Sequence, residues 1–418
     1  MSWPATYRHG MAIIICGSSA WQYWRTPPVL RDTCIDPDVA VAPKAAGGLG
    51  IPKSLISYAS NAREADKLIR GRLLTDLKGL STPVHAMAAA GTCSMRATLA
   101  VRPQIIPAWL NLRVHTVNLG NGLSVLTPEA TLLTLGTNLG PITIAKMMFE
   151  ACGIFSLTPH TTRLAHTLCQ LVSDKELLDS LNAAPSIYGH SDEHGQPLGF
   201  LDARGRPLPW KPCIDLHGNM ADMWRRPPLT SVENLSVVAK GLVGAVGIED
   251  ARRALRLVAD GAASPAEVYS YLLLCTGARQ GSESLRQPDL NRRIILSPEA
   301  RMLAHRTFCI GDLVWDDQMC VLEVLGEAYH ADNLGYKVDT ARRPALESMG
   351  YEVQELMYEQ LANLELLDAV LPSLARRLGF KLQKRTVAFL RRRQNLHDEL
   401  FRRPYEPDSK GWPKIRIR

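Results

Sequence analysis

Apolar and polar residues alternate over short stretches in the first third of the chain, as they do in strands. An apolar run over residues 12–16 predicts a strand, and Gly17-Ser18-Ser19 predicts a turn into a short helix. Further short runs between residues 82 and 126, separated by Gly, Pro and Asn, predict an antiparallel meander. Thr127, followed by a proline, predicts the capped start of the next helix.

The pattern changes after residue 229, where helical periodicity dominates and a mixed series of elements follows. Ser264 and Glu267 have the spacing of a capping box, which predicts a helix start. The series is predicted to contain this helix, two strands of one hairpin, a short helix and a third strand, at residues 264–275, 308–315, 319–325, 343–349 and 351–356. Long helix is expected from residue 359 onward.

Residues 184–228 are polar and rich in Gly and Pro, which is typical of loops. We therefore predict an α/β protein in four parts: an α+β domain at 1–183, this insert at 184–228, a mixed sheet flanked by helices at 229–371, and a basic helical tail at 372–418. The insert is a candidate site for a protein partner. It also holds four potential zinc ligands, but their helical spacing in a turn-rich loop favours ordinary loop residues: His190, His194, Cys213 and His217.

Composition excludes several classes of protein. The chain has 418 residues, of which 46% are hydrophobic and 21% charged, so two or three folded domains are expected. No apolar run is long enough to cross a bilayer, and no secretory signal is recognisable, so we expect a cytoplasmic protein without a membrane partner. The nine cysteines are scattered without a CxxC pair, so neither a disulfide framework nor a zinc ribbon is predicted.

Positive charge is concentrated at the C-terminal end. The net charge is +7, and residues 376–418 hold fourteen Lys and Arg against four acidic residues. Such a stripe can bind a phosphate backbone, but it is also typical of a solvated helix face. The candidate phosphate-binding residues of this stripe are Lys384, Arg385, Arg391, Arg392 and Arg393.

Three acidic residues fall on successive predicted elements. Asp312 and Glu323 lie on the two strands of the predicted hairpin, so pairing brings their carboxylates near each other. Glu267, on the preceding helix, could add a third oxygen, although the capping box competes for it. Carboxylate oxygens are the ligands that Mg²⁺ prefers, and Mg²⁺ or Mn²⁺ can activate water for attack on a phosphodiester.

The same region resembles the very-short-patch-repair type of the PD-(D/E)xK endonuclease-like superfamily. The resemblance is carried by Gly311-Asp312-Leu313-Val314-Trp315, by Glu323-x2-Gly326-x3-His330, and by Asp339-x2-Arg342-Arg343 before Gly350-Tyr351-x-Val353. It implies a restriction-endonuclease-like fold, a metal on Asp312 and Glu323, and His330 near the scissile phosphate. It further implies that Asp339 and Arg342 shape the site, and that Arg342 and Arg343 are candidate contacts to nucleic acid, with DNA favoured.

One position departs from this family. Residue 325 shares a strand face with Glu323, and such nucleases carry Lys or an acid there, whereas this chain has Leu325. Lys337 is the candidate substitute. Two functions therefore stay open. The first is a metal-dependent nucleic-acid phosphodiesterase, for which phage defence is a candidate setting. The second is a catalytically inactive nucleic-acid-binding or antitoxin-like regulatory module.

The N-terminal half is faintly similar to the abortive-infection E-type antitoxin. The resemblance is carried by Ile15-Cys16-Gly17-Ser18-Ser19-Ala20, Val114-His115, residues 127–133 and Glu150-x-Cys152-Gly153. It implies an antitoxin-like N-terminal domain, and it supports the second of the two functions.

Overall fold

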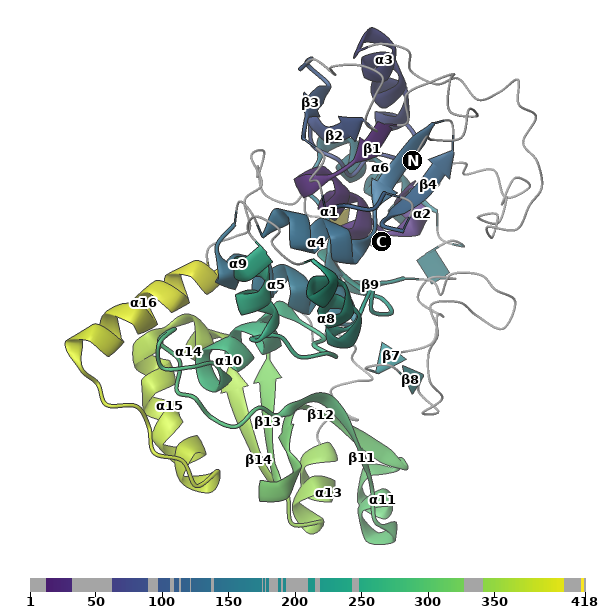
Figure 1. Cartoon of the computed structure of the whole chain (residues 1–418). Helices are drawn as coiled ribbons and strands as arrows, with labels where there is room; N and C mark the ends of the chain where they lie inside the picture. Colours follow the sequence, from purple (N-terminus) through teal and green to yellow (C-terminus); the bar gives the residue numbers. More distant parts are fainter. Residues whose placement is uncertain are drawn as a thin grey trace.

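A computed structural model gives the architecture of most of the chain (Figure 1). Among the residues that it describes, no helix combines the length and apolar character needed to cross a membrane. The described residues are 13–31, 62–88, 97–105, 109–112, 114–120, 122–136, 139–174, 176, 178–179, 187–188, 191–192, 210–214, 219–242, 248–326, 341–401 and 415–416. The predicted site residues His330, Lys337 and Asp339, and the potential zinc ligands His190, His194 and His217, lie outside them.

A five-stranded sheet forms the N-terminal part. Its strands, in spatial order, are β3 (Val101–Pro103), β2 (Val84–Ala88), β1 (Ile13–Ile15), β5 (Leu123–Leu126) and β4 (Thr116–Gly120). The helices of this part are α1 (Gly17–Arg25), α2 (Pro28–Arg31) and α3 (Ala62–Leu73). The predicted meander is wrong, because β2 pairs with β3 and β1 with β5 in parallel, and only the β1–β2 and β4–β5 pairs are antiparallel.

Helices and a small antiparallel sheet form the middle of the molecule. The sheet pairs β10 (Asn219–Arg225) with β6 (Phe155–Leu157), β9 (Lys211–Ile214) and β15 (Ile415–Arg416). Thr127 caps α4 as predicted, accepting a hydrogen bond from the Ala130 amide, and Ser231 caps α8 by accepting from the Asn234 amide. The helices are α4 (Pro128–Leu135), α5 (Pro141–Cys152), α6 (Thr162–Ser173), α8 (Val232–Gly241) and α9 (Ile248–Leu255). A separate two-residue ladder joins β7 (Ile187–Tyr188) to β8 (Ser191–Asp192).

A four-stranded mixed sheet lies in the C-terminal part. Its strands, in spatial order, are β11 (Asp289–Ile295), β12 (Phe308–Trp315), β13 (Cys320–Leu325) and β14 (Glu352–Met357). The first three are antiparallel, and β14 runs parallel to β13. The predicted hairpin is confirmed, with the short 3-10 turn η4 (Asp316–Gln318) between its strands, and so is the later helix, α13 (Arg342–Ser348).

Helices cover both faces of this sheet. Leu313 and Leu322 share one apolar core with α10 (Pro265–Cys275), which lies on one face. Val314 and Val321 share a second core with residues of α11 (Pro298–Ala304) and α13 on the other. The α/β class predicted from the sequence is therefore confirmed in this part of the molecule.

The large apolar core crosses the domain boundary expected at residues 184–228. It joins Met148 and Phe149 of α5 to Tyr271 and Leu272 of α10, and the Phe149 and Tyr271 rings meet edge to face with centroids 5.2 Å apart. Figure 1 shows the N-terminal sheet and the mixed sheet at opposite ends of the molecule, with α5, α8 and α10 between them. The two ends are thus connected by a shared core rather than by a simple linker.

The C-terminal helices pack onto this core. They are α14 (Tyr358–Ala362), α15 (Leu364–Arg377) and α16 (Val387–Phe401). Arg393 of α16 is only 1% exposed, and its guanidinium lies 3.0 Å from Glu283 Oε1 and 2.7 Å from Asp368 Oδ1. Arg385 shares Glu283 at 2.8 Å. This ionic cluster fixes α16 to α15 and to the loop after α10.

We expect Arg393→Ala to lower the free energy of unfolding by about 3 kcal/mol or more, because it leaves the buried carboxylate of Glu283 without its buried cation. Urea denaturation of the full chain measures this loss. Arg391→Ala, two residues earlier on an exposed face, is the matched control and should change stability by less than about 0.5 kcal/mol. Equal effects of the two substitutions would show that the cluster does not stabilise the fold.

Candidate acidic site on the mixed sheet

Two of the predicted acidic residues come from paired strands, as the sequence led us to expect. The β12–β13 ladder pairs Leu313 with Leu322, so the next position places Asp312 opposite Glu323. The remaining predicted ligand, Glu267, begins the helix that packs on β12 and β13. The three carboxylates nevertheless have different neighbours, and these neighbours decide what each can do.

Glu323 is a buried member of an ion pair. Its side chain is 6% exposed, and its Oε2 meets the Nη2 of Arg342, which is 21% exposed and begins α13. A carboxylate buried in a sheet needs a positive partner, and this guanidinium supplies one. Arg342 therefore takes the position that a metal ion would need beside Glu323.

The Asp312 side chain accepts a hydrogen bond from the backbone of the neighbouring strand β13. Its Oδ2 accepts a hydrogen bond of 2.8 Å from the Val324 amide, just where the β12–β13 ladder ends at Leu313 and Leu322. One carboxylate oxygen of Asp312 is thus used to continue the hydrogen bonding of β13 beyond the last strand pair.

Glu267 is held at the start of α10 by four hydrogen bonds to Ala263, Ser264 and Asn291. Its Oε2 accepts from the Ala263 amide at 2.8 Å and from the Asn291 side chain at 2.5 Å, and its Oε1 accepts from Ser264 Oγ at 2.8 Å. The Glu267 amide in turn donates to Ser264 Oγ, so Ser264 caps α10 as predicted, while the Glu267 side chain bonds the Ala263 amide instead of the Ser264 amide of a full capping box. Burial, together with the charge of Asp312, raises the pKa of Glu267 to about 7.

The described residues contain no group of three or more His, Cys, Asp or Glu side chains arranged to hold a metal ion. The oxygens of these residues already have protein partners, because Glu323 pairs with a guanidinium and both oxygens of Glu267 accept hydrogen bonds from protein donors. Leu325, on the same strand face as Glu323, adds no charge. The described residues of the predicted site therefore do not fit a Mg²⁺ or Mn²⁺ ion.

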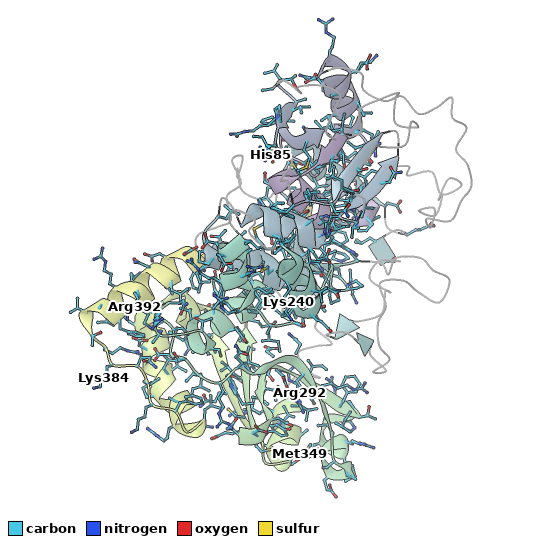
Figure 2. All side chains as sticks on the ribbon, viewed as in Figure 1. His85, Lys240, Arg292, Met349, Lys384 and Arg392 are labelled. Carbon is cyan, nitrogen blue, oxygen red and sulfur yellow. The ribbon has the colours of Figure 1, made fainter. Side chains whose placement is uncertain are left out.

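The predicted phosphate-binding residues fall into two groups. Arg393 is buried in its ionic cluster, Arg385 pairs with Glu283, and Arg343 pairs with Glu347 and Glu355. We therefore remove Arg393 from the candidate binding residues, since it has no surface to offer. Lys384, Arg391 and Arg392 are exposed, and Figure 2 shows Lys384 and Arg392 at the outer edge of the molecule.

Sequence reasoning missed the residues that satisfy the carboxylates. Arg342 was assigned to nucleic acid, although a buried Glu on a central strand already requires a cation nearby. Asn291, which donates to Glu267, was not identified at all. Its backbone has a φ of 47°, a left-handed conformation that Asn tolerates better than most residues, and this preference was the available signal.

The chain was compared with protein-family models, with curated proteins and with solved structures, and none of them matches it.

We expect Glu323→Gln to lower the free energy of unfolding by about 1–3 kcal/mol, because the Arg342 guanidinium then loses its charge partner. Chemical denaturation of the full chain without divalent ions measures the loss. Glu347→Gln, which removes an exposed partner of Arg343, is the control and should cost less than about 0.5 kcal/mol. Unchanged or increased stability of Glu323→Gln would mean that Glu323 is strained by its acidic neighbours instead of paired.

Glu267 should make stability depend on pH. Because the folded protein keeps this proton to a higher pH than the unfolded chain, stability should fall as the pH rises from about 4.5 to about 7. Glu267→Gln removes the titration, so the variant should gain stability relative to the parent across this window. Urea denaturation of both proteins at several pH values gives the comparison, and parallel pH profiles would refute the raised pKa.

Proposed function

We propose that the C-terminal part is a nuclease-like module that binds nucleic acid without cleaving it. The observation that carries this proposal is the Glu323–Arg342 pair, in which a protein cation neutralises the carboxylate expected to hold the metal. The N-terminal part is then the regulatory half of the same protein, in line with its faint antitoxin resemblance.

The topology supports a relation to PD-(D/E)xK nucleases. Helix α10, strands β12 and β13, helix α13 and strand β14 follow one another in the predicted order, with β11 and α11 as additional elements between α10 and β12. Asp312 and Glu323 occupy the second and third strands of the sheet. A restriction-endonuclease-like fold is therefore our interpretation of this sheet.

The chemistry of the acidic residues favours binding over hydrolysis. A metal ion at Glu323 would have to displace the Arg342 guanidinium from a buried carboxylate, which is costly because the guanidinium would lose its partner. Leu325 also offers no group to orient a water molecule. Both features agree with a fold that keeps its acidic residues for internal pairing.

A basic surface supplies the proposed contact with nucleic acid. It consists of five exposed cations on the loop after α10, on the segment before α16 and on α16 itself: Arg279, Lys381, Lys384, Arg391 and Arg392. Phosphate contacts of this kind give affinity without sequence preference and depend strongly on salt.

Packing holds these segments together. The Arg392 Nε donates to the Ala278 carbonyl at 3.2 Å, and Gly281, at a φ of 97°, lies so close to α16 that a Cβ there would meet the Arg392 carbonyl carbon at 2.5 Å. The Gln383 amide also donates to Glu283 Oε2 at 3.1 Å. The cations are therefore presented on fixed backbone, which lowers the entropy lost when they bind phosphates.

The metal-dependent phosphodiesterase remains the second candidate function. It is favoured by one observation, the location of Asp312 and Glu323 on paired strands.

A binding and cleavage experiment decides between them. We expect the full chain to bind a short DNA duplex, and the triple variant Lys384→Ala, Arg391→Ala, Arg392→Ala to bind at least about tenfold more weakly with a salt slope smaller by about 2–3. Fluorescence anisotropy over a salt series measures both values. The control, Lys67→Ala, Lys240→Ala, Arg253→Ala, removes the same charge from exposed positions elsewhere and should keep the salt slope.

The same DNA should stay intact with Mg²⁺ or Mn²⁺. Cleavage that disappears in Asp312→Ala and Glu323→Ala would establish the phosphodiesterase instead. Binding that is equal in the two triple variants would overturn the assignment of the basic surface.

A further inference from the structure

A cavity of about 460 Å³ lies between the N-terminal sheet and the helices of the middle of the molecule. It is bounded by the start of α1, by β2 and β3, and by parts of α4, α5, β6 and α10. This volume falls in the range of sites for small molecules. Asp312, Glu323 and Glu267 do not line this cavity, although α10, which carries Glu267, contributes part of its wall.

One end of the cavity carries three polar side chains that converge. Ser18 Oγ lies 3.4 Å from His85 Nδ1, and His85 is the register partner of Arg102 on the adjacent parallel strand. Gly17 allows this close approach, since its φ is 55° and a Cβ there would lie 3.1 Å from His85 Nδ1. Figure 2 places His85 within the N-terminal part.

This polar end is rich in hydrogen-bond donors and carries positive charge. Arg102 is exposed. The burial of His85, together with the positive charge of Arg102, lowers the pKa of His85. The imidazole is therefore neutral at pH 7 and can donate from one nitrogen. The acidic residue of the lining, Glu150, is already paired with Arg25 at 2.8 Å and accepts from the Leu157 amide. No side chain caps the first turn of α1 at Cys16, so its amides add to the donors.

The rest of the lining is mainly apolar. It includes Trp21, Met87, Leu135, Met147, Phe155 and Val268. These side chains come from α1, β2, α4, α5, α10 and the start of β6, so the apolar wall is built from both sides of the cavity. A ligand that fits must combine a compact anionic group with an apolar body.

We propose that this cavity binds a small amphipathic anion, with its phosphate or carboxylate group at Ser18, His85 and Arg102 and its apolar body against the opposite wall. Nucleoside monophosphates and medium-chain carboxylates share this chemistry. The proposal does not depend on the nucleic-acid-binding function, because none of these three residues belongs to the basic surface.

Calorimetric titration of the full chain with adenosine 5′-monophosphate and, separately, with decanoate tests the proposal. We expect one probe to bind with a Kd on the order of 10 µM. Arg102→Gln should raise this Kd about ten- to hundredfold, because a charge-assisted hydrogen bond is lost, and Ser18→Ala should raise it less. Both side chains are exposed, so neither change removes core packing.

The two probes distinguish the sources of the anion. Binding of the nucleotide alone assigns the site to a nucleotide, and binding of decanoate alone assigns it to a fatty carboxylate. Lys67→Gln, which removes an exposed cation of α3, is the control and should leave the Kd unchanged. Failure of both probes to bind at about 1 mM, or affinity that is the same in Arg102→Gln and the parent chain, would overturn the proposal.

Discussion

A carboxylate buried on a central strand has to be neutralised, and this requirement governs the C-terminal half of the protein. Three partners can do it: a proton, a metal ion or a protein cation. Glu323 has the third, the guanidinium of Arg342, which ties the start of α13 to β13. The same carboxylate is the expected metal ligand. The ion pair that stabilises the sheet is therefore also the reason that we propose binding of nucleic acid without cleavage.

Similar pairs connect the other parts of the molecule. Arg25 of α1 meets Glu150 of α5 at 2.8 Å, and Arg393 of α16 meets Glu283 and Asp368. Much of the arginine in the sequence is therefore structural. In the basic tail, the buried Arg393 holds α16 in place, whereas Arg391 and Arg392 are exposed. Charge counts along the sequence do not separate these two environments.

Local patterns predicted the local elements well. The β12–β13 hairpin was predicted at residues 308–325, and Ser264 with Glu267 identified the start of α10. Long-range pairing was not predictable in this way. The parallel pairs of the N-terminal sheet join strands that are distant in sequence, and the burial of Arg393 depends on carboxylates 25 and more residues away. The cavity beside Ser18 likewise exists only because separate segments meet there.

Crystals of the full chain exposed to millimolar Mn²⁺, with anomalous diffraction recorded, test the central claim most directly. The Glu323–Arg342 pair predicts no manganese peak beside Asp312 or Glu323 and a guanidinium still in contact with Glu323. A manganese ion coordinated by both carboxylates, with the Arg342 side chain displaced, would contradict it.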